Sequence, residues 1–367
     1  CNTYIINRDG FPGHIAWNYD LILSMGIEGL ISRVKMYLEK ETDEASINFY
    51  KGVIISLEAV MEWNQRHIDA MYLMLDSASG DEKESILENI RVMEHVPAMP
   101  ARNFREALQS FYFIFLCVMY EMPYGGNSPG RFDYFLWKYL KQEYESGEIT
   151  YQEACEYLAE LFIKIDERVH DLDGHVNTIV VGGLAPDGSD AVNPLSYMIL
   201  DVFQSLNITH PAVYTRISYK NPQEYLDRCV AYLMNGGNRS QILSDDAMIP
   251  AIAKDGHIPF EDAAMYVCGG CMEISPHGMN SELLFSFLFN TPKVLELSIT
   301  GGECLITGKH LLDLDRSLES FTTFEDFYSY FLDLCKKILY EKFHALDIVT
   351  EEMARCRPGY LISSMIS

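Results

Sequence analysis

The stretch NTIVVGG, residues 177–183, marks the point at which the sequence pattern changes, and it decides the fold class. Three more short β-rich runs follow it, PAVYTRIS (211–218), SQILSD (240–245) and AMYVCGG (264–270). Helical stretches separate most of these runs, at 193–206, 222–235 and 246–254. Strands that alternate with helices predict βαβ units and a parallel sheet, so we expect an α/β fold.

The sequence before residue 175 predicts helices. Residues 43–75 carry apolar side chains at helical spacing and end near the turn-forming SASGDE. Residues 103–122 are hydrophobic on nearly every side, which predicts a central helix, and residues 150–169 form an amphipathic helix capped by Thr150. We therefore expect one domain over 1–367, with a mostly helical part at 1–175 and an alternating strand–helix part at 176–367.

Composition excludes several classes of partner. The chain has 367 residues and a formal net charge of −25, which argues against binding to nucleic acid or to anionic membranes. Its longest strongly apolar run, 111–120, is far shorter than the about 20 residues of a transmembrane helix. The first ten residues show no signal-peptide pattern. Nine scattered cysteines indicate a reduced cytoplasmic protein without a disulfide framework.

Cys268 and Cys271 stand three positions apart, a spacing found in redox dithiols and in zinc sites. Two glycines fill the gap, and Ser275–Pro276 follow soon after, which disfavours the helix that a thioredoxin-like motif opens. A structural zinc site needs four ligands, and the neighbouring sequence offers no second pair. We expect no metal site. Cys268 is expected to be a buried strand residue, and the same structural role is the plain alternative for Cys271.

Cys271 and Glu273 form the candidate catalytic pair. In an extended segment the side chains at i and i+2 project to the same side, so a thiol and a carboxylate share one pocket. Gly269 and Gly270 allow close backbone approach and unusual dihedral angles. A neighbouring carboxylate disfavours the thiolate anion, so this arrangement is poorly suited to nucleophilic attack by Cys271. The pair suits a cysteine that transfers a hydrogen atom, with the glutamate as a separate base.

Parallel α/β folds collect their chemistry at the carboxyl ends of the strands, and Cys271 directly follows the last predicted strand. A comparison along the whole chain rests on segments 10–30, 100–113, 130–143, 180–201, 210–218, 261–274, 321–331 and 357–367. In this order they resemble the glycyl radical enzymes, the pyruvate formate-lyase-like superfamily. The G-C-x-E loop around Cys271 resembles the active-site loop of that family.

This resemblance implies a ten-stranded α/β barrel, present here in part, with an N-terminal helical region and with Cys271 on a loop inside the barrel. It implies that Cys271 is the thiyl radical that abstracts hydrogen from a small-molecule substrate, and that Glu273 is the general base. It also implies that the radical is stored on a glycine in a separate C-terminal loop. A radical S-adenosylmethionine activating enzyme installs that radical, so this chain needs no bound cofactor. The resemblance further implies an anaerobic homodimer.

Position 272 discriminates within the family. The resemblance implies two adjacent cysteines at this place in pyruvate formate-lyase proper, where this chain has Cys271 and Met272. Met272 cannot pass on an acyl group, so a formate C-acetyltransferase-like activity is a disfavoured alternative. The C-x-E form resembles eliminases that act on diols, choline, isethionate or hydroxyproline, and also arylacetate decarboxylases. Glycerol-type dehydratases carry an aspartate where this chain has Phe285, which keeps the decarboxylase alternative open. A catalytically inactive relative or a binding module is the alternative of another class.

Arg131, Arg216 and Phe285 are candidate substrate-binding residues. The plain alternatives are structural. Arg131 with Asp133 can cap a helix and form a local ion pair, and Arg216 can pair with an acidic residue. His14 is interpreted as a structural residue at a turn. Residues 244–249, SDDAMI, are interpreted as a helix N-cap instead of metal ligands.

The segment CRPGYLISS, residues 356–364, resembles the family's Arg-Val-x-Gly-Tyr radical motif only superficially. Its spacing is one residue short, and its Pro-Gly pair predicts a turn before an apolar strand. We therefore expect a fragment without the N-terminal part and without the glycyl loop of the family, inactive on its own.

Overall fold

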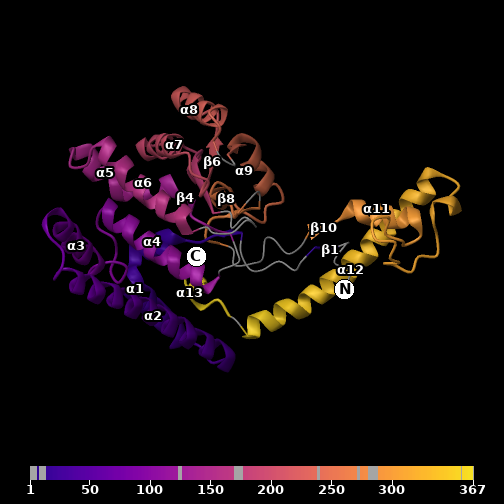
Figure 1. Ribbon diagram of the computed structural model, residues 1–367, viewed down its shortest axis with the longest axis horizontal. Helices are drawn as coiled ribbons and strands as arrows, with labels where there is room; N and C mark the ends of the chain where they lie inside the picture. Colours follow the sequence, from indigo (N-terminus) through magenta and orange to yellow (C-terminus); the bar gives the residue numbers. More distant parts are fainter. Residues whose placement is uncertain are drawn as a thin grey trace. The chain divides into compact units, whose positions relative to one another are not determined.

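A computed structural model describes residues 6–7, 14–122, 126–168, 177–237, 240–270, 273–279, 288–356 and 358–366. The chain divides into two compact units (Figure 1). Unit 1 comprises Cys1–Phe11 and Phe285–Pro358, and unit 2 comprises Pro12–Leu284 and Gly359–Ser367. Each unit therefore combines segments that lie far apart in the sequence.

The first part of unit 2 is helical, as the sequence predicts. The described helices here are α1 (Tyr19–Leu38), α2 (Glu44–Met74), α3 (Gly80–Met93), α4 (Phe104–Glu121), α5 (Phe132–Ser146) and α6 (Tyr151–Arg168). Asn103 caps α4 by accepting a hydrogen bond from Glu106 N at 2.9 Å. The predicted cap at Thr150 is confirmed, because its hydroxyl oxygen accepts from Glu153 N at 3.2 Å.

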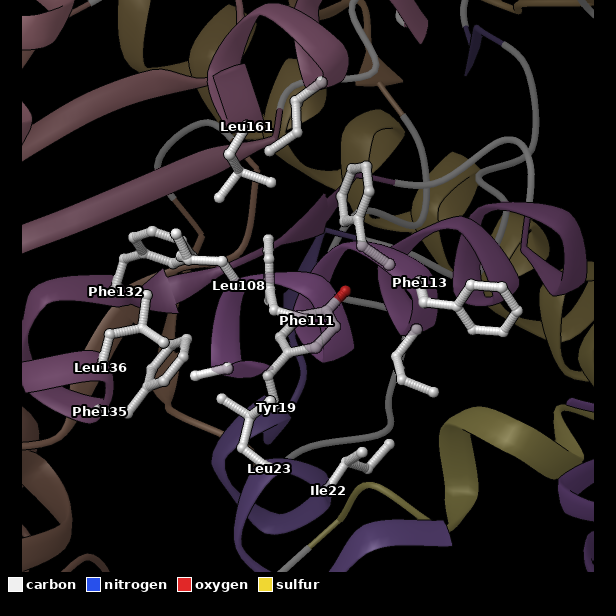
Figure 2. Close-up of a cluster of buried hydrophobic side chains, with 14 of the residues drawn as sticks. Tyr19, Ile22, Leu23, Leu108, Phe111, Phe113, Phe132, Phe135, Leu136 and Leu161 are labelled. Carbon is white, nitrogen blue, oxygen red and sulfur yellow. The ribbon is translucent and has the colours of Figure 1, made fainter. Parts of the chain in front are cut away.

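Helix α4 is central, as its apolar sequence predicts. Phe104, Phe111 and Phe115 on this helix are fully buried, and Tyr19 meets Phe111 edge-on with ring centroids 4.7 Å apart. Figure 2 shows this cluster, in which side chains from α1, α4, α5 and α6 point toward one another. A phenylalanine in such a position contributes about 3–5 kcal/mol relative to alanine. The helical layer thus forms a large part of the buried core of unit 2.

A four-stranded parallel sheet follows, in the order β4-β5-β6-β7. Its strands are β4 (Gly130–Arg131), β5 (Thr178–Gly182), β6 (Ala212–Ile217) and β7 (Gln241–Ser244). Helices α7 (Pro194–Leu206) and α8 (Gln223–Met234) connect consecutive strands, and α9 (Asp245–Ala253) follows β7. The predicted βαβ units and parallel sheet are confirmed for these runs.

The fourth predicted run has a different partner. It forms β8 (Tyr266–Cys268), which follows the short helix α10 (Phe260–Ala263) and pairs antiparallel with β9 (Ile274–Pro276). Another short pair, β2 (Ile15–Ala16) and β3 (Asn127–Ser128), is parallel. β8 is therefore the first strand of a hairpin and does not extend the parallel sheet.

The last segment of unit 2 differs from its prediction. Residues 360–363 form the short helix α13 (Tyr360–Ser363), where the sequence predicts a strand. The two carboxylate oxygens of Glu121 accept hydrogen bonds from Leu361 N and Ile362 N, each at 2.9 Å. A carboxylate at free N–H groups stabilises a helix start, so a residue distant in sequence decides the local structure.

Unit 1 is built on its own small core. β1 (Ile6–Asn7) pairs antiparallel with β10 (Leu288–Phe289), and the helical elements are α11 (Thr291–Thr300), the 3-10 turn η1 (Leu318–Ser320) and α12 (Phe324–Cys356). Val294 and Leu297 of α11 pack with Leu334 and Cys335 of α12. Among the helices of the described residues in both units, none combines the length and apolar character needed to span a bilayer.

Candidate active site

The predicted catalytic loop connects β8 to β9. Cys268 is fully buried at the end of β8, as predicted, and it lies opposite Ile274 in the hairpin register. Gly269 N donates a hydrogen bond to the Glu273 carbonyl at 2.9 Å, which closes the loop. Cys271 and Met272 lie outside the described residues, so the structure describes the loop on both sides of the predicted thiol.

Two buried hydroxyl groups hold the backbone just before Cys271. The Ser128 hydroxyl donates to the Gly269 carbonyl, and the Thr178 hydroxyl donates to the Gly270 carbonyl. Thr178 N in turn donates to the Ser128 hydroxyl oxygen at 2.9 Å. Both side chains are fully buried, so water does not compete for these hydrogen bonds. The two peptide groups that lead into Cys271 are therefore fixed to β3 and β5.

The loop meets the sheet at an edge that the sequence interpretation did not expect. Thr178 is the first residue of β5, whereas the beginning of β8 lies near the last residues of β5 and β6. β8 therefore runs opposite to the parallel strands and delivers the loop to their amino ends. Chemistry collects at the carboxyl ends of strands that belong to one parallel sheet. β8 is not part of the parallel sheet, so this rule does not apply to the loop that follows it.

Gly269 and Gly270 are required for close approach. A Cβ on Gly269 would overlap the backbone carbonyl of His14, and a Cβ on Gly270 would lie 2.5 Å from His14 Nδ1. Neither glycine has a φ in the left-handed region, so the expected unusual dihedral angles are absent from this described pair. The space for the segment around His14 is the physical reason for both glycines.

His14 is a candidate residue that sequence reasoning missed. Its Nδ1 lies 3.0 Å from Oε2 of Glu273, and the two side chains are only 15% and 17% exposed. His14 has a φ of 57°, an unusual value for a residue other than glycine, and such strain is common at functional sites. The available signal was the Gly-His pair in segment 10–30. An imidazole beside a carboxylate can share or relay a proton, so His14 joins Glu273 as a candidate residue of this site.

Arg131 is fully buried at the end of β4. Its Nη2 donates to the Gly182 carbonyl at 2.9 Å, and its Nη1 donates to the Ala264 carbonyl at 3.2 Å. The expected local pairing with Asp133 takes another form, since the Asp133 carboxylate accepts from Gly182 N and from the Ser196 hydroxyl. Burial lowers the pKa of Arg131 and raises the pKa of Asp133, as expected for charges removed from water. A substrate contact of Arg131 stays a prediction.

Arg216 is also fully buried, and it forms a two-point ion pair with Asp245. Nε and Nη2 lie 2.8 Å from Oδ1 and Oδ2, respectively, and Nη1 donates to the Tyr266 carbonyl at 3.1 Å. The structural alternative for Arg216 is thus present in the structure, and its substrate contact stays a prediction. Phe285 lies outside the described residues.

The helix start expected at residues 244–249 is confirmed, but the side-chain capping hydrogen bond is not formed. Ser244 is the N-cap residue of α9, but its side chain makes no capping hydrogen bond. Asp245 points to Arg216, and Asp246 accepts from the Ser218 hydroxyl at 2.9 Å and from Tyr219 N at 3.0 Å. Both aspartates therefore serve tertiary contacts. Among the described residues, no group of three or more His, Cys, Asp or Glu side chains is arranged to hold a metal ion.

Comparison with known proteins identifies the class. The family model described as "Pyruvate formate lyase-like" matches residues 6–367, so the chain belongs to the pyruvate formate lyase-like family. It is 25% identical to isethionate sulfite-lyase of Bilophila wadsworthia over 96% of this chain and 45% of that protein. It is 24% identical to trans-4-hydroxy-L-proline dehydratase of Clostridioides difficile over 97% of this chain and 47% of that protein. The chain thus spans about half the length of the curated relatives that it matches.

A solved structure agrees with this family. The crystal structure of a glycyl radical enzyme from Archaeoglobus fulgidus superimposes with a TM-score of 0.88 and 25% identity, covering 97% of this chain and 48% of that one. The predicted fold class is confirmed: the chain is α/β and has the fold of part of a glycyl radical enzyme barrel.

Proposed function

We propose that this chain forms the catalytic core of a glycyl radical lyase, in which Cys271 as a thiyl radical abstracts hydrogen and Glu273 is the general base. The observation that carries the proposal is the fixed loop: its carbonyls are bound by Ser128 and Thr178, and Glu273 contacts His14 at its far end. The similarity to a sulfite-lyase and a dehydratase supports an elimination.

The proposed reaction begins at a hydroxyl-bearing carbon of a small substrate. Cys271 takes the hydrogen atom of that carbon, so a C–H bond breaks and an S–H bond forms. Glu273 takes the hydroxyl proton, and the resulting ketyl radical expels the leaving group on the neighbouring carbon. Cys271 then returns its hydrogen atom to the product radical. In this proposal His14 accepts the proton in turn, and the 3.0 Å between its Nδ1 and the carboxylate supports that role.

The wider proposal includes the partners that this chemistry needs. A radical S-adenosylmethionine enzyme installs the glycyl radical that supplies the unpaired electron. In this proposal the chain itself binds no cofactor. We also propose a homodimer that works without oxygen in the cytoplasm. Every cysteine that the structure describes is a free thiol, which supports a reducing compartment. Residues 1–367 form one partial domain in this proposal, divided near residue 175.

The test is turnover by the activated, complete gene product that contains this chain. A panel of diols, choline, isethionate, hydroxyproline and arylacetates is offered without oxygen. We expect Cys271→Ala to abolish turnover while the glycyl radical signal in electron paramagnetic resonance persists. Glu273→Gln should lower kcat by about 100- to 10 000-fold, the range for lost general base catalysis.

Cys268→Ala is the matched control, because it removes a buried thiol three positions earlier in the same hairpin. It should retain turnover. If Cys271→Ala also retained turnover, the thiyl mechanism would be wrong. Turnover of arylacetates alone would select the decarboxylase alternative.

A further inference from the structure

Asp245 connects three elements of the barrel. Its carboxylate accepts hydrogen bonds from Arg216 of β6, from the Tyr266 hydroxyl of β8 at 2.7 Å, and from Leu184 N beyond β5 at 2.6 Å. Arg216 donates twice, through Nε and Nη2, so the carboxylate accepts four hydrogen bonds, all of them buried. The Asp245 side chain itself is 0% exposed. One carboxylate therefore ties the first residue of β8 to the parallel sheet.

Tyr266 is held at three points. Its hydroxyl donates to Asp245, its carbonyl accepts from Arg216 Nη1 at 3.1 Å, and the Arg216 guanidinium lies 4.0 Å from its ring centroid. The last contact is a cation–π interaction in a desolvated place, where such contacts are strongest. Arg131 holds the Ala264 carbonyl just before it at 3.2 Å. The beginning of β8 is thus fixed through side chain and backbone together.

The burial of Arg216 favours a role in positioning β8 over a role in binding substrate. Its guanidinium is 0% exposed, and it already has a charged partner in Asp245. Opening this pair to admit a substrate would leave a buried charge unpaired, which is strongly unfavourable. The contacts of Arg216 instead act on β8, the strand that leads to Cys271.

We propose that Arg216, Asp245 and Tyr266 form a positioning unit that fixes β8 on the sheet and so sets the place of the Cys271–Glu273 loop. β8 is held at its beginning by this unit and just beyond its end by Ser128 and Thr178. Since the strand has only three residues, movement at its beginning reaches the loop directly. The effect on turnover rests on the proposed function, whereas the effect on the loop does not.

The test is Tyr266→Phe in this chain, which removes the phenolic O–H and keeps the ring. Asp245 Oδ1 still accepts from Arg216 Nε, so no buried acceptor is left without a donor. Two readouts follow the loop: hydrogen exchange of residues 264–279 and the alkylation rate of Cys271 by iodoacetamide, assigned by peptide fragmentation. We expect both to rise about tenfold, which equals about 1.4 kcal/mol of local opening free energy.

Tyr225→Phe is the matched control. The Tyr225 hydroxyl is equally buried on the sheet, but it donates to the Val181 and Arg216 carbonyls and not to the Asp245 carboxylate. It should leave both loop readouts within about twofold of the unchanged chain. Circular dichroism should show both variants folded. Equal effects of the two variants, or no effect of Tyr266→Phe, would overturn the proposal.

Kinetics separate this proposal from the proposed function. In the activated gene product, Tyr266→Phe should lower kcat with little change in KM, because Tyr266 positions the thiol and does not contact substrate. A protein without any turnover would contradict the proposed function, while exchange and alkylation would still decide the positioning role. A rise in KM with unchanged kcat would place the unit in substrate binding and contradict positioning.

Discussion

His277 is a buried histidine whose environment fixes its protonation state. Its Nε2 lies 2.9 Å from the Trp17 carbonyl, and a Cβ at Gly130 would lie 2.5 Å from the same nitrogen. Burial, the largest cause, lowers the pKa of His277 to about 4. The ring is therefore neutral at neutral pH and belongs to the packing between β2 and β4.

We predict that His277 makes unit 2 sensitive to acid. Its pKa is about 4 in the folded state and 6.5 in the unfolded state, so the unfolded chain binds more protons between these values. The stability present above pH 6.5 should be lost as the pH falls toward 4. The loss amounts to about 3 kcal/mol in the free energy of unfolding. Urea denaturation from pH 7 to pH 4 measures it.

His277→Gln is the control, since glutamine can donate to the Trp17 carbonyl but does not titrate. Its stability curve should fall less steeply than that of the unchanged chain over the same range. Parallel curves for the two proteins would show that His277 does not titrate between these pH values on unfolding.

At the scale of elements, α13 depends on residues that lie far away in the sequence. Glu121, at the end of α4, binds its first N–H groups, and Tyr360 packs with Phe49 of α2 at 5.4 Å between ring centroids. A Cβ at Gly52 would lie 2.5 Å from the Tyr360 ring. α13 is therefore a small element held almost entirely by tertiary contacts.

Glu121→Ala should release α13 without unfolding the rest of unit 2. Two backbone N–H groups lose a charged acceptor, which should cost about 1–3 kcal/mol in the free energy of unfolding. Hydrogen exchange should rise mainly in residues 359–366. Glu148→Ala removes the same charge from an exposed position and should change neither quantity. Unchanged exchange in 359–366 of Glu121→Ala would contradict the cap.

At the scale of the whole molecule, the net charge of −25 opposes compaction. Several described ion pairs are exposed, among them Arg66 with Glu62 and Lys336 with Asp333. Exposed pairs of this kind contribute little to stability. Repulsion among the excess carboxylates therefore affects the stability of the fold more than these exposed ion pairs do.

Raising KCl from 0.05 to 0.5 M should accordingly raise the Tm, because the screening length shortens and the repulsion weakens. We expect a rise of about 1 °C, equal to about 1 kcal/mol for a chain of this size. Thermal unfolding followed by circular dichroism measures it, and NaCl should act alike. A Tm that falls with salt would mean that attractive pairs dominate the surface.

Much of the local structure could be predicted from the sequence. The helix in which Phe111 is buried, the parallel strands β5 to β7, the cap at Thr150 and the buried Cys268 all follow from patterns that neighbouring residues create. Apolar spacing and capping depend on a few residues along one element, so a single sequence contains them. The same local rule made Glu273 a candidate base, since residues i and i+2 share one side of an extended segment.

Other features were decided only by the tertiary structure. His14 meets Glu273, Asp245 joins Arg216 to Tyr266, β8 runs against the sheet, and Glu121 turns an apolar segment into α13. Each contact joins residues far apart in the chain. Local pattern does not encode such partners, because they depend on which elements pack together and in which direction. The sequence by itself determined the elements and the candidate pair of loop residues, and packing determined what surrounds that loop and holds it in place.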